Sequence, residues 1–129
     1  MIVVPKPLVS HWREQISWHV ARGALPGEVL VDPLGDFGDT GPDGATAPLR
    51  RVGSLRDHYS ASKLASASIV LTCCERLTHE QRLTASGGGE SVLAELKWVR
   101  LMCDEGHHLG GGAVTNAKRL LERVVAERR

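Results

Sequence analysis

Aromatic side chains and long apolar runs are both scarce in this sequence. Three tryptophans, one tyrosine and one phenylalanine are its only aromatic residues among 129. No apolar run approaches the roughly 20 residues that a helix needs to cross a bilayer. The N-terminus MIVVPKP also lacks the apolar core and cleavage pattern of a signal peptide. We therefore expect no contact with a membrane, and one folded domain spanning residues 1–129.

Cysteine is scarce as well. The three cysteines cannot all pair within one chain. Because no export signal is visible, the simplest interpretation is free thiols in a reducing cytoplasm.

Signature motifs of several enzyme classes are missing. A P-loop needs G-x-x-x-x-G-K-[ST], and neither SGGGE at 86–90 nor LGGGA at 109–113 contains the lysine. No G-x-S-x-G nucleophile motif occurs either. The glycine runs therefore predict chain reversals between helices. The alternative is an anion bound at bare helix amides, with help from Ser86, Ser91 and Thr115.

A thiol nucleophile is the other catalytic option. Cys73 or Cys74 could pair with His79. Both cysteines lie in the most apolar stretch, which should raise a thiol pKa and argues against a hydrolase.

Four residues carry the nitrogen and sulfur atoms for a tetrahedral zinc site: Cys74, His79, Cys103 and His107. No C-x-x-C motif occurs among them, and Gly106 should end the helix that precedes His107. A structural role therefore competes with a metal site, and we predict no cofactor.

Charge is unevenly distributed although the net charge is only +1. Residues 1–43 carry three basic and six acidic residues, while residues 44–129 carry 13 basic and nine acidic ones. Either this is an ordinary mixed surface, or the second part faces an acidic partner such as nucleic acid. The candidate phosphate contacts are Arg50, Arg51, Arg56, Lys63, Lys118, Arg119 and Arg123.

The first part of the chain predicts a helix beside a long loop. Apolar spacing supports a helix from Ser10 to about Arg22, and one or two short strands at 1–4 and 29–31 could pair with each other. Residues 24–53 are rich in proline, glycine and aspartate and predict an irregular loop. Its acidic residues do not have calcium-site spacing, so turns are expected there for Asp32, Asp36, Asp39 and Asp43.

The second part of the chain, residues 54–129, predicts a three-helix bundle. A cap at Ser54 begins the first helix, which runs to about residue 77 and is rich in serine and alanine. Ser68–Cys73 could instead be a buried strand, because it contains β-branched residues. Apolar spacing predicts the other two helices at 90–105 and 113–128.

These patterns predict a mainly α fold: an N-terminal helix, the loop and the C-terminal bundle. The absence of catalytic motifs favours a non-catalytic subunit that acts through protein–protein contacts, or self-association, in a larger assembly. Nucleic acid is a candidate component of it, as in nucleoprotein complexes and phage particles. The expected protein-contact residues are Trp12, Trp18 and Phe37. The alternative function is a metal-binding protein or metalloenzyme that uses the Cys/His set.

Overall fold

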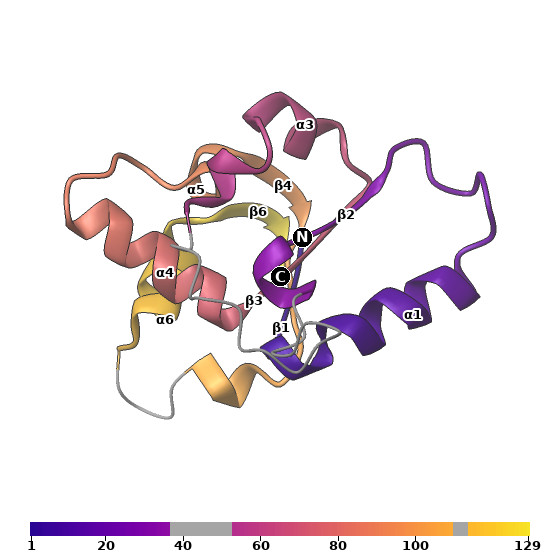
Figure 1. Ribbon diagram of the computed structural model, residues 1–129, viewed down its shortest axis with the longest axis horizontal. Helices are drawn as coiled ribbons and strands as arrows, with labels where there is room; N and C mark the ends of the chain where they lie inside the picture. Colours follow the sequence, from indigo (N-terminus) through magenta and orange to yellow (C-terminus); the bar gives the residue numbers. More distant parts are fainter. Residues whose placement is uncertain (37–52, 110–113) are drawn as a thin grey trace, which may run out of the picture.

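A parallel β-sheet forms the centre of the protein. The computed structural model describes residues 1–36, 53–109 and 114–129. Its main sheet contains β1 (Ile2–Val4), β2 (Val29–Val31), β3 (Ile69–Cys73) and β5 (Met102–Cys103). The strand order is β2-β3-β1-β5, and every pairing is parallel. Parallel sheets are normally covered by helices on both faces, and that is the arrangement here (Figure 1).

A second parallel pair continues this sheet. It consists of β4 (Lys97–Arg100) and β6 (Val125–Arg128). Leu101 alone separates β4 from β5, and its backbone N–H donates to the Arg128 carbonyl at 2.9 Å. The next N–H, of Met102, donates to the Met1 carbonyl at 3.0 Å. The strand that runs from β4 into β5 therefore joins the two sheets.

Helices cover the two faces of the main sheet. The longer ones are α1 (Val9–His19), α4 (Cys74–Ala85) and α6 (Asn116–Arg123). Figure 1 shows α1 on one side of the strands, with α4 and α6 on the other. The short helices are α2 (Pro33–Asp36), α3 (Ala61–Ser66) and α5 (Val92–Glu95), and the 3₁₀ turns are η1 (Lys6–Leu8), η2 (Leu55–Asp57) and η3 (Gly106–Leu109).

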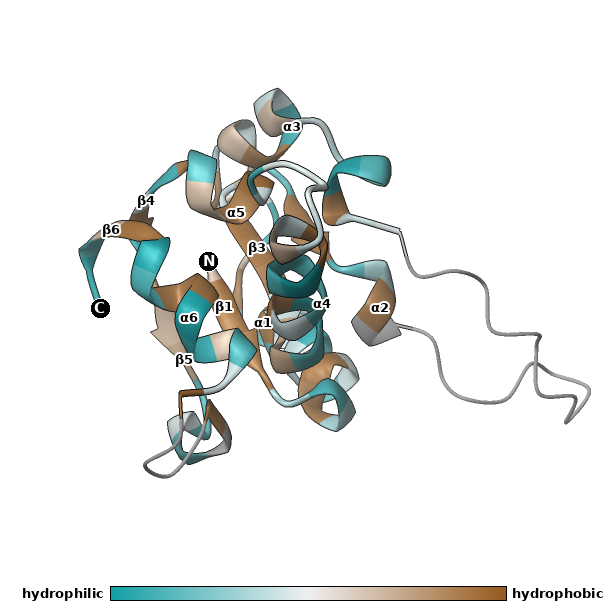
Figure 2. Ribbon diagram, turned by 90° about the vertical axis from the view of Figure 1, so that its left-hand side faces the viewer, coloured by the Kyte–Doolittle hydropathy of each residue, from teal (hydrophilic) through white to brown (hydrophobic). Residues whose placement is uncertain are grey.

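Alternate residues of the strands supply two hydrophobic clusters. Val3 of β1 and Val70 of β3 belong to the larger cluster, with residues of α4, α5 and α6. Their neighbours Val4 and Leu71 belong to the smaller cluster, under α1 and α2. Successive strand side chains point to opposite faces, so β1 and β3 each contribute to both clusters. Figure 2 shows β1 and β3 as hydrophobic and much of α6 as hydrophilic.

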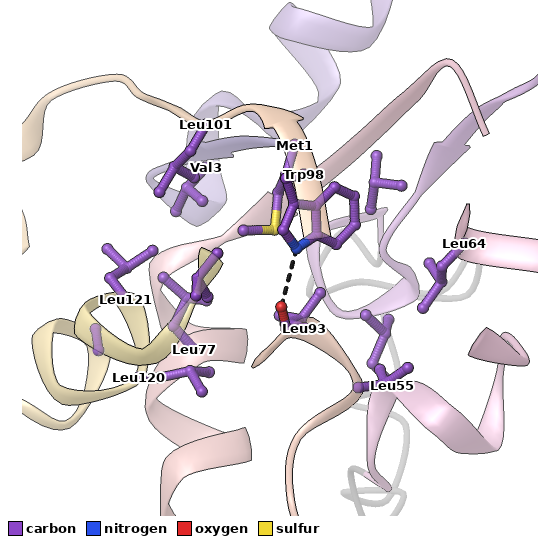
Figure 3. Close-up of a cluster of buried hydrophobic side chains, with 14 of the residues drawn as sticks. Met1, Val3, Leu55, Leu64, Leu77, Leu93, Trp98, Leu101, Leu120 and Leu121 are labelled. Atoms are coloured by element: carbon purple, nitrogen blue, oxygen red, sulfur yellow. Dashed lines mark hydrogen bonds between the residues drawn. The ribbon is translucent and has the colours of Figure 1, made fainter. Parts of the chain in front are cut away.

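Trp98 lies inside the larger cluster. Its indole N–H donates to the Leu93 carbonyl at 2.9 Å, which satisfies the one polar atom of this side chain. Figure 3 shows the ring beside Met1, above the leucines of α4 and α6.

The prediction of a mainly α fold with a bundle over 54–129 is wrong, because this part of the chain supplies four strands. Ser54 does accept a hydrogen bond from the Arg56 N–H, but it caps only the single turn η2. After α3 the chain becomes extended at Ala67, and the strand alternative for Ser68–Cys73 is the correct one.

The predictions of the other two bundle helices are also wrong in part. The segment 90–105 contains only the four-residue α5, followed by β4 and β5. The segment 113–128 divides into α6 and β6. The expected pairing of strand 29–31 with strand 1–4 is wrong too, because β2 pairs with β3.

Several local predictions are confirmed. The N-terminal helix exists as α1, and both predicted short strands exist as β1 and β2. In the first glycine run, Gly87 and Gly89 have φ of 87° and 84°, values that favour glycine and reverse the chain after α4. The second run lies mostly outside the described residues. No helix in the described part of the chain is long and apolar enough to cross a membrane.

Candidate functional site at the carboxyl edge of the sheet

The carboxyl ends of three neighbouring strands meet at one edge of the sheet. Pro5 follows β1, Cys74 follows β3 and Asp104 follows β5. The strands are parallel, so these residues leave the sheet on the same side. In open α/β sheets, ligands bind in the crevice outside the carboxyl ends of the strands. This edge is therefore the candidate ligand-binding edge of the sheet.

Asp104 is held in a defined orientation there. Its backbone N–H donates to the Val3 carbonyl at 2.9 Å, which extends the β1–β5 pairing by one residue. Its side-chain Oδ2 accepts a hydrogen bond from Trp12 Nε1 at 2.8 Å. Its Oδ1 accepts one from the Glu105 backbone N–H at 3.0 Å. Both carboxylate oxygens are thus oriented, and within residues 1–36, 53–109 and 114–129 both of these hydrogen bonds come from neutral donors.

Glu105 has a strained backbone. Its φ is 51°, the only positive value at a non-glycine position in the described residues. Side chains other than glycine are disfavoured in this conformation, and such strain concentrates at functional sites. Glu105 Oε2 lies 3.1 Å from His107 Nδ1, and both side chains are exposed. Two adjacent carboxylates, a half-buried one on Asp104 and an exposed one on Glu105, therefore follow the end of β5.

A groove of about 490 Å³ opens at the ends of β1 and β3. Its polar lining comes from Cys74, Glu75, Thr78, His79, Arg82 and Thr115. His79 Nε2 is buried and has no hydrogen-bond partner in the structure. The groove is in the size range of small-molecule sites.

Comparison with known proteins identifies the family of this chain. The family model of the SNF2-related domain matches residues 1–129. The chain belongs to the family of SNF2-related domains. It is also similar to the "F-box protein At3g54460" of Arabidopsis thaliana, with 31% identity over 120 residues. The match covers 90% of this chain and only 7% of that protein, so the domain corresponds to a small part of its relative.

The thiols of the SNF2-related domain are poorly suited to nucleophilic chemistry. Burial raises the pKa of Cys73 to about 12 and that of Cys74 to about 11. Burial also raises the pKa of Cys103, although Arg129 and the N-terminal amine oppose this shift. All three cysteines are free. At neutral pH they are therefore thiols, not the thiolates that attack substrates or bind metals.

The SNF2-related domain does not assemble the predicted metal ligands into one cluster. Cys74 and His79 lie on α4, Cys103 on β5 and His107 on η3. No group of three or more metal-binding side chains comes together within residues 1–36, 53–109 and 114–129. His107 pairs with Glu105 instead.

The predicted phosphate contacts lie on separate elements. Lys118, Arg119 and Arg123 share α6, whereas Arg56 lies on η2 and Lys63 on α3 (Figure 1). Three of these residues pair with carboxylates: Arg56 with Glu95 at 2.5 Å, Arg123 with Glu90 at 2.9 Å, and Lys63 with Glu28. Arg50 and Arg51 lie outside the described residues.

The three predicted protein-contact residues differ in their surroundings. Trp18 is 69% exposed on α1. Trp12, earlier on the same helix, is partly buried and hydrogen-bonded to Asp104. Phe37 lies outside the described residues.

A buried charged network was not predicted from the sequence. Arg76 binds Asp32 and lies 3.8 Å from Glu80, and all three side chains are almost completely buried. The turn expected at Asp32 is confirmed, since its Oδ1 accepts a hydrogen bond from the Leu34 N–H. Sequence analysis also missed Asp104 and Glu105, although an acidic pair directly after a strand is a recognisable signal.

Proposed function

We propose that this SNF2-related domain acts through contacts within a larger assembly that holds nucleic acid. Its family membership and the small share of its relative that it matches support a component role. The 129 residues also contain no P-loop motif, so they carry no complete nucleotide site of that type.

The proposal that the assembly holds nucleic acid is supported by the exposed face of α6. Ala117, Leu120 and Leu121 are buried, whereas Arg119 is exposed and Lys118 is half-buried at the edge of the buried face. Arg119 and Arg123 are both exposed and one turn apart, so they can reach successive phosphates once Arg123 exchanges its Glu90 partner for a phosphate.

Salt dependence of binding tests this proposal. Fluorescence anisotropy measures the affinity for a labelled DNA duplex at several salt concentrations. The slope of the logarithm of the binding constant against the logarithm of the salt concentration should decrease in magnitude by about 0.9 for each phosphate contact removed. We expect the double change Arg119→Gln with Arg123→Gln to lower the slope by the amount of about two phosphate contacts. Arg22→Gln, beyond the far end of α1, is the matched control. An identical slope in both variants would reject α6 as the contact surface.

The acidic edge favours a second candidate function, in binding a magnesium-bound nucleotide. In P-loop NTPases an aspartate of this kind holds Mg²⁺. Mg²⁺ is usually bound by one or two carboxylates together with substrate phosphates. Asp104 and Glu105 fit this requirement, because they are adjacent and Asp104 is oriented. Magnesium would neutralise phosphate charge when bound, and the phosphate-binding loop would come from elsewhere in the assembly.

Binding of Mn²⁺, a spectroscopic substitute for Mg²⁺, tests the second candidate. Asp104→Asn should weaken it at least tenfold, and Glu75→Gln at the nearby groove is the matched control. Equal affinities would contradict the assignment.

The alternative metal centre at Cys74, His79, Cys103 and His107 has less support, because the raised thiol pKa values oppose thiolate ligation. Elemental analysis tests it: stoichiometric zinc that is lost in Cys103→Ser would restore this alternative. The free cysteines support a reducing, cytoplasmic location as part of the proposal.

A further inference from the structure

We propose that Trp12 is a positioning residue that holds the Asp104 carboxylate in the orientation needed to bind a magnesium ion. This inference rests on the second candidate function above. It extends that function to a side chain on α1, 92 positions away in the sequence.

The indole ring of Trp12 is fixed by its surroundings. It packs against the smaller hydrophobic cluster, which is built from Val4, Val9, Leu71 and Cys73. Val9 begins α1 and is completely buried, so the start of this helix is anchored to the sheet. With the ring held by apolar contacts, its N–H is presented to Asp104 Oδ2 at 2.8 Å.

The chemistry of the indole suits a metal-binding carboxylate. An indole N–H donates one hydrogen bond, cannot accept one and carries no charge. It therefore orients Asp104 without neutralising it. The two oxygens of a carboxylate have about four acceptor positions, and two are used here, by Trp12 and by the Glu105 N–H. The remaining positions can face a cation.

Asp32 provides the contrast within the same structure. Its two oxygens accept hydrogen bonds from Arg76, Thr72 and the Leu34 N–H, and its side chain is fully buried. Arg76 neutralises that carboxylate and occupies its acceptor positions. Asp104 is held by a neutral donor at a partly exposed edge, which leaves its charge available.

The indole N–H signals of the three tryptophans give a direct test by NMR. Low concentrations of Mn²⁺ should broaden the signal of Trp12 before those of Trp18, on the exposed side of α1, and Trp98, in the core. Trp12→Phe removes the donor and should weaken Mn²⁺ binding about tenfold, within the 10–100-fold range of outer-shell partners. Trp18→Phe is the matched control and should bind Mn²⁺ like the unchanged domain.

The variants separate the two proposals. If Trp12→Phe binds Mn²⁺ normally while Asp104→Asn does not, the role of Trp12 is wrong and the site remains. If Asp104→Asn binds normally, the magnesium site itself is wrong. If Trp12→Phe does not fold, the indole N–H signal of Trp12 in the unchanged domain still tests the inference. Mg²⁺ at saturating concentration must shift the Trp12 signal, and a constant signal would overturn the inference.

Discussion

Arg76 and Asp32 form a buried ion pair across 44 positions of sequence. The guanidinium donates from Nε to Asp32 Oδ2 at 3.0 Å and from Nη2 to Oδ1 at 2.9 Å. The side chains are 1% and 0% exposed. Arg76 Nη1 also donates to the Gly53 carbonyl at 2.6 Å, so one side chain of α4 joins the end of β2 to the segment before η2.

Glu80 extends this network toward α5. It accepts hydrogen bonds from the Leu55 N–H at 2.6 Å and from Ser91 Oγ at 2.8 Å. Ser54 Oγ adds a third donor at 3.1 Å. The α4 helix therefore holds three separate segments through buried polar groups.

Arg76→Met should destabilise the domain by about 3–5 kcal/mol, because it leaves the Asp32 and Glu80 carboxylates buried without their cation. Denaturant unfolding measures this free energy. Arg82→Met, on the exposed part of the same helix, should change it by less than about 0.5 kcal/mol. A similar small effect at Arg76 would show that the ion pair does not form.

Local elements could be predicted where one helix face or one turn decides the structure. The spacing of Trp12, Ile16 and His19 predicted α1, and turn chemistry predicted the reversal at 86–90. The sheet could not be predicted this way. Buried parallel strands are apolar on both faces, so Ile69–Cys73 shows no alternation that distinguishes it from a buried helix.

Helical spacing was misleading in the segment 90–105. Val92, Leu96, Val99 and Cys103 have the four-three-four spacing of a helix face, yet Val99 is 73% exposed on β4. Strands of two to four residues are too short to show a period of their own. The misassigned helix also hid Asp104 and Glu105, because an acidic pair is informative only once it is known to follow a strand.

Stability should fall as the pH rises above 9. The pKa of Cys73 is about 12 in the folded protein, compared with 9.0 for a free thiol, because burial disfavours the thiolate. The unfolded chain loses this proton first, so the contribution of Cys73 is complete below pH 9 and disappears progressively toward pH 12. Chemical denaturation at pH 8 and at pH 10.5 measures the change.

Cys73→Ala is the control for this pH dependence. It lowers stability at both pH values by leaving a cavity, but it should reduce the difference between them. A difference as large as that of the unchanged domain would assign the effect to other groups.

Gly27→Ala should destabilise the domain by about 1–3 kcal/mol. A Cβ atom there would lie 2.3 Å from the Ser66 carbonyl oxygen and 3.0 Å from the Ser68 backbone nitrogen. These are backbone atoms at the entrance to β3 and cannot move aside independently. Gly106→Ala is a suitable comparison, since its Cβ would meet no atom within 4 Å. Thermal unfolding of both variants measures the difference, and equal midpoints would contradict the close approach of these segments.

Glu105→Gly should stabilise the domain and weaken its binding of Mn²⁺. Glycine adopts the φ of 51° without the cost of about 1–2 kcal/mol that other residues incur, but it loses about 0.5–1 kcal/mol through the greater freedom of the unfolded chain. The expected net gain is therefore about 0.5–1 kcal/mol. Glu75→Gly in the first turn of α4 should have the opposite effect, a loss of stability, because glycine gains freedom in the unfolded chain and the carboxylate at the helix N-terminus is removed.

The two measurements on Glu105→Gly separate a functional strain from an incidental one. If the strain is retained for cation binding, the more stable variant should bind Mn²⁺ several-fold more weakly, because the second carboxylate is lost. Unchanged Mn²⁺ affinity together with higher stability would mean that Asp104 binds the cation without Glu105. A loss of stability would instead show that the pairing of Glu105 with His107 at 3.1 Å outweighs the backbone strain, and the conformation would then need no functional explanation.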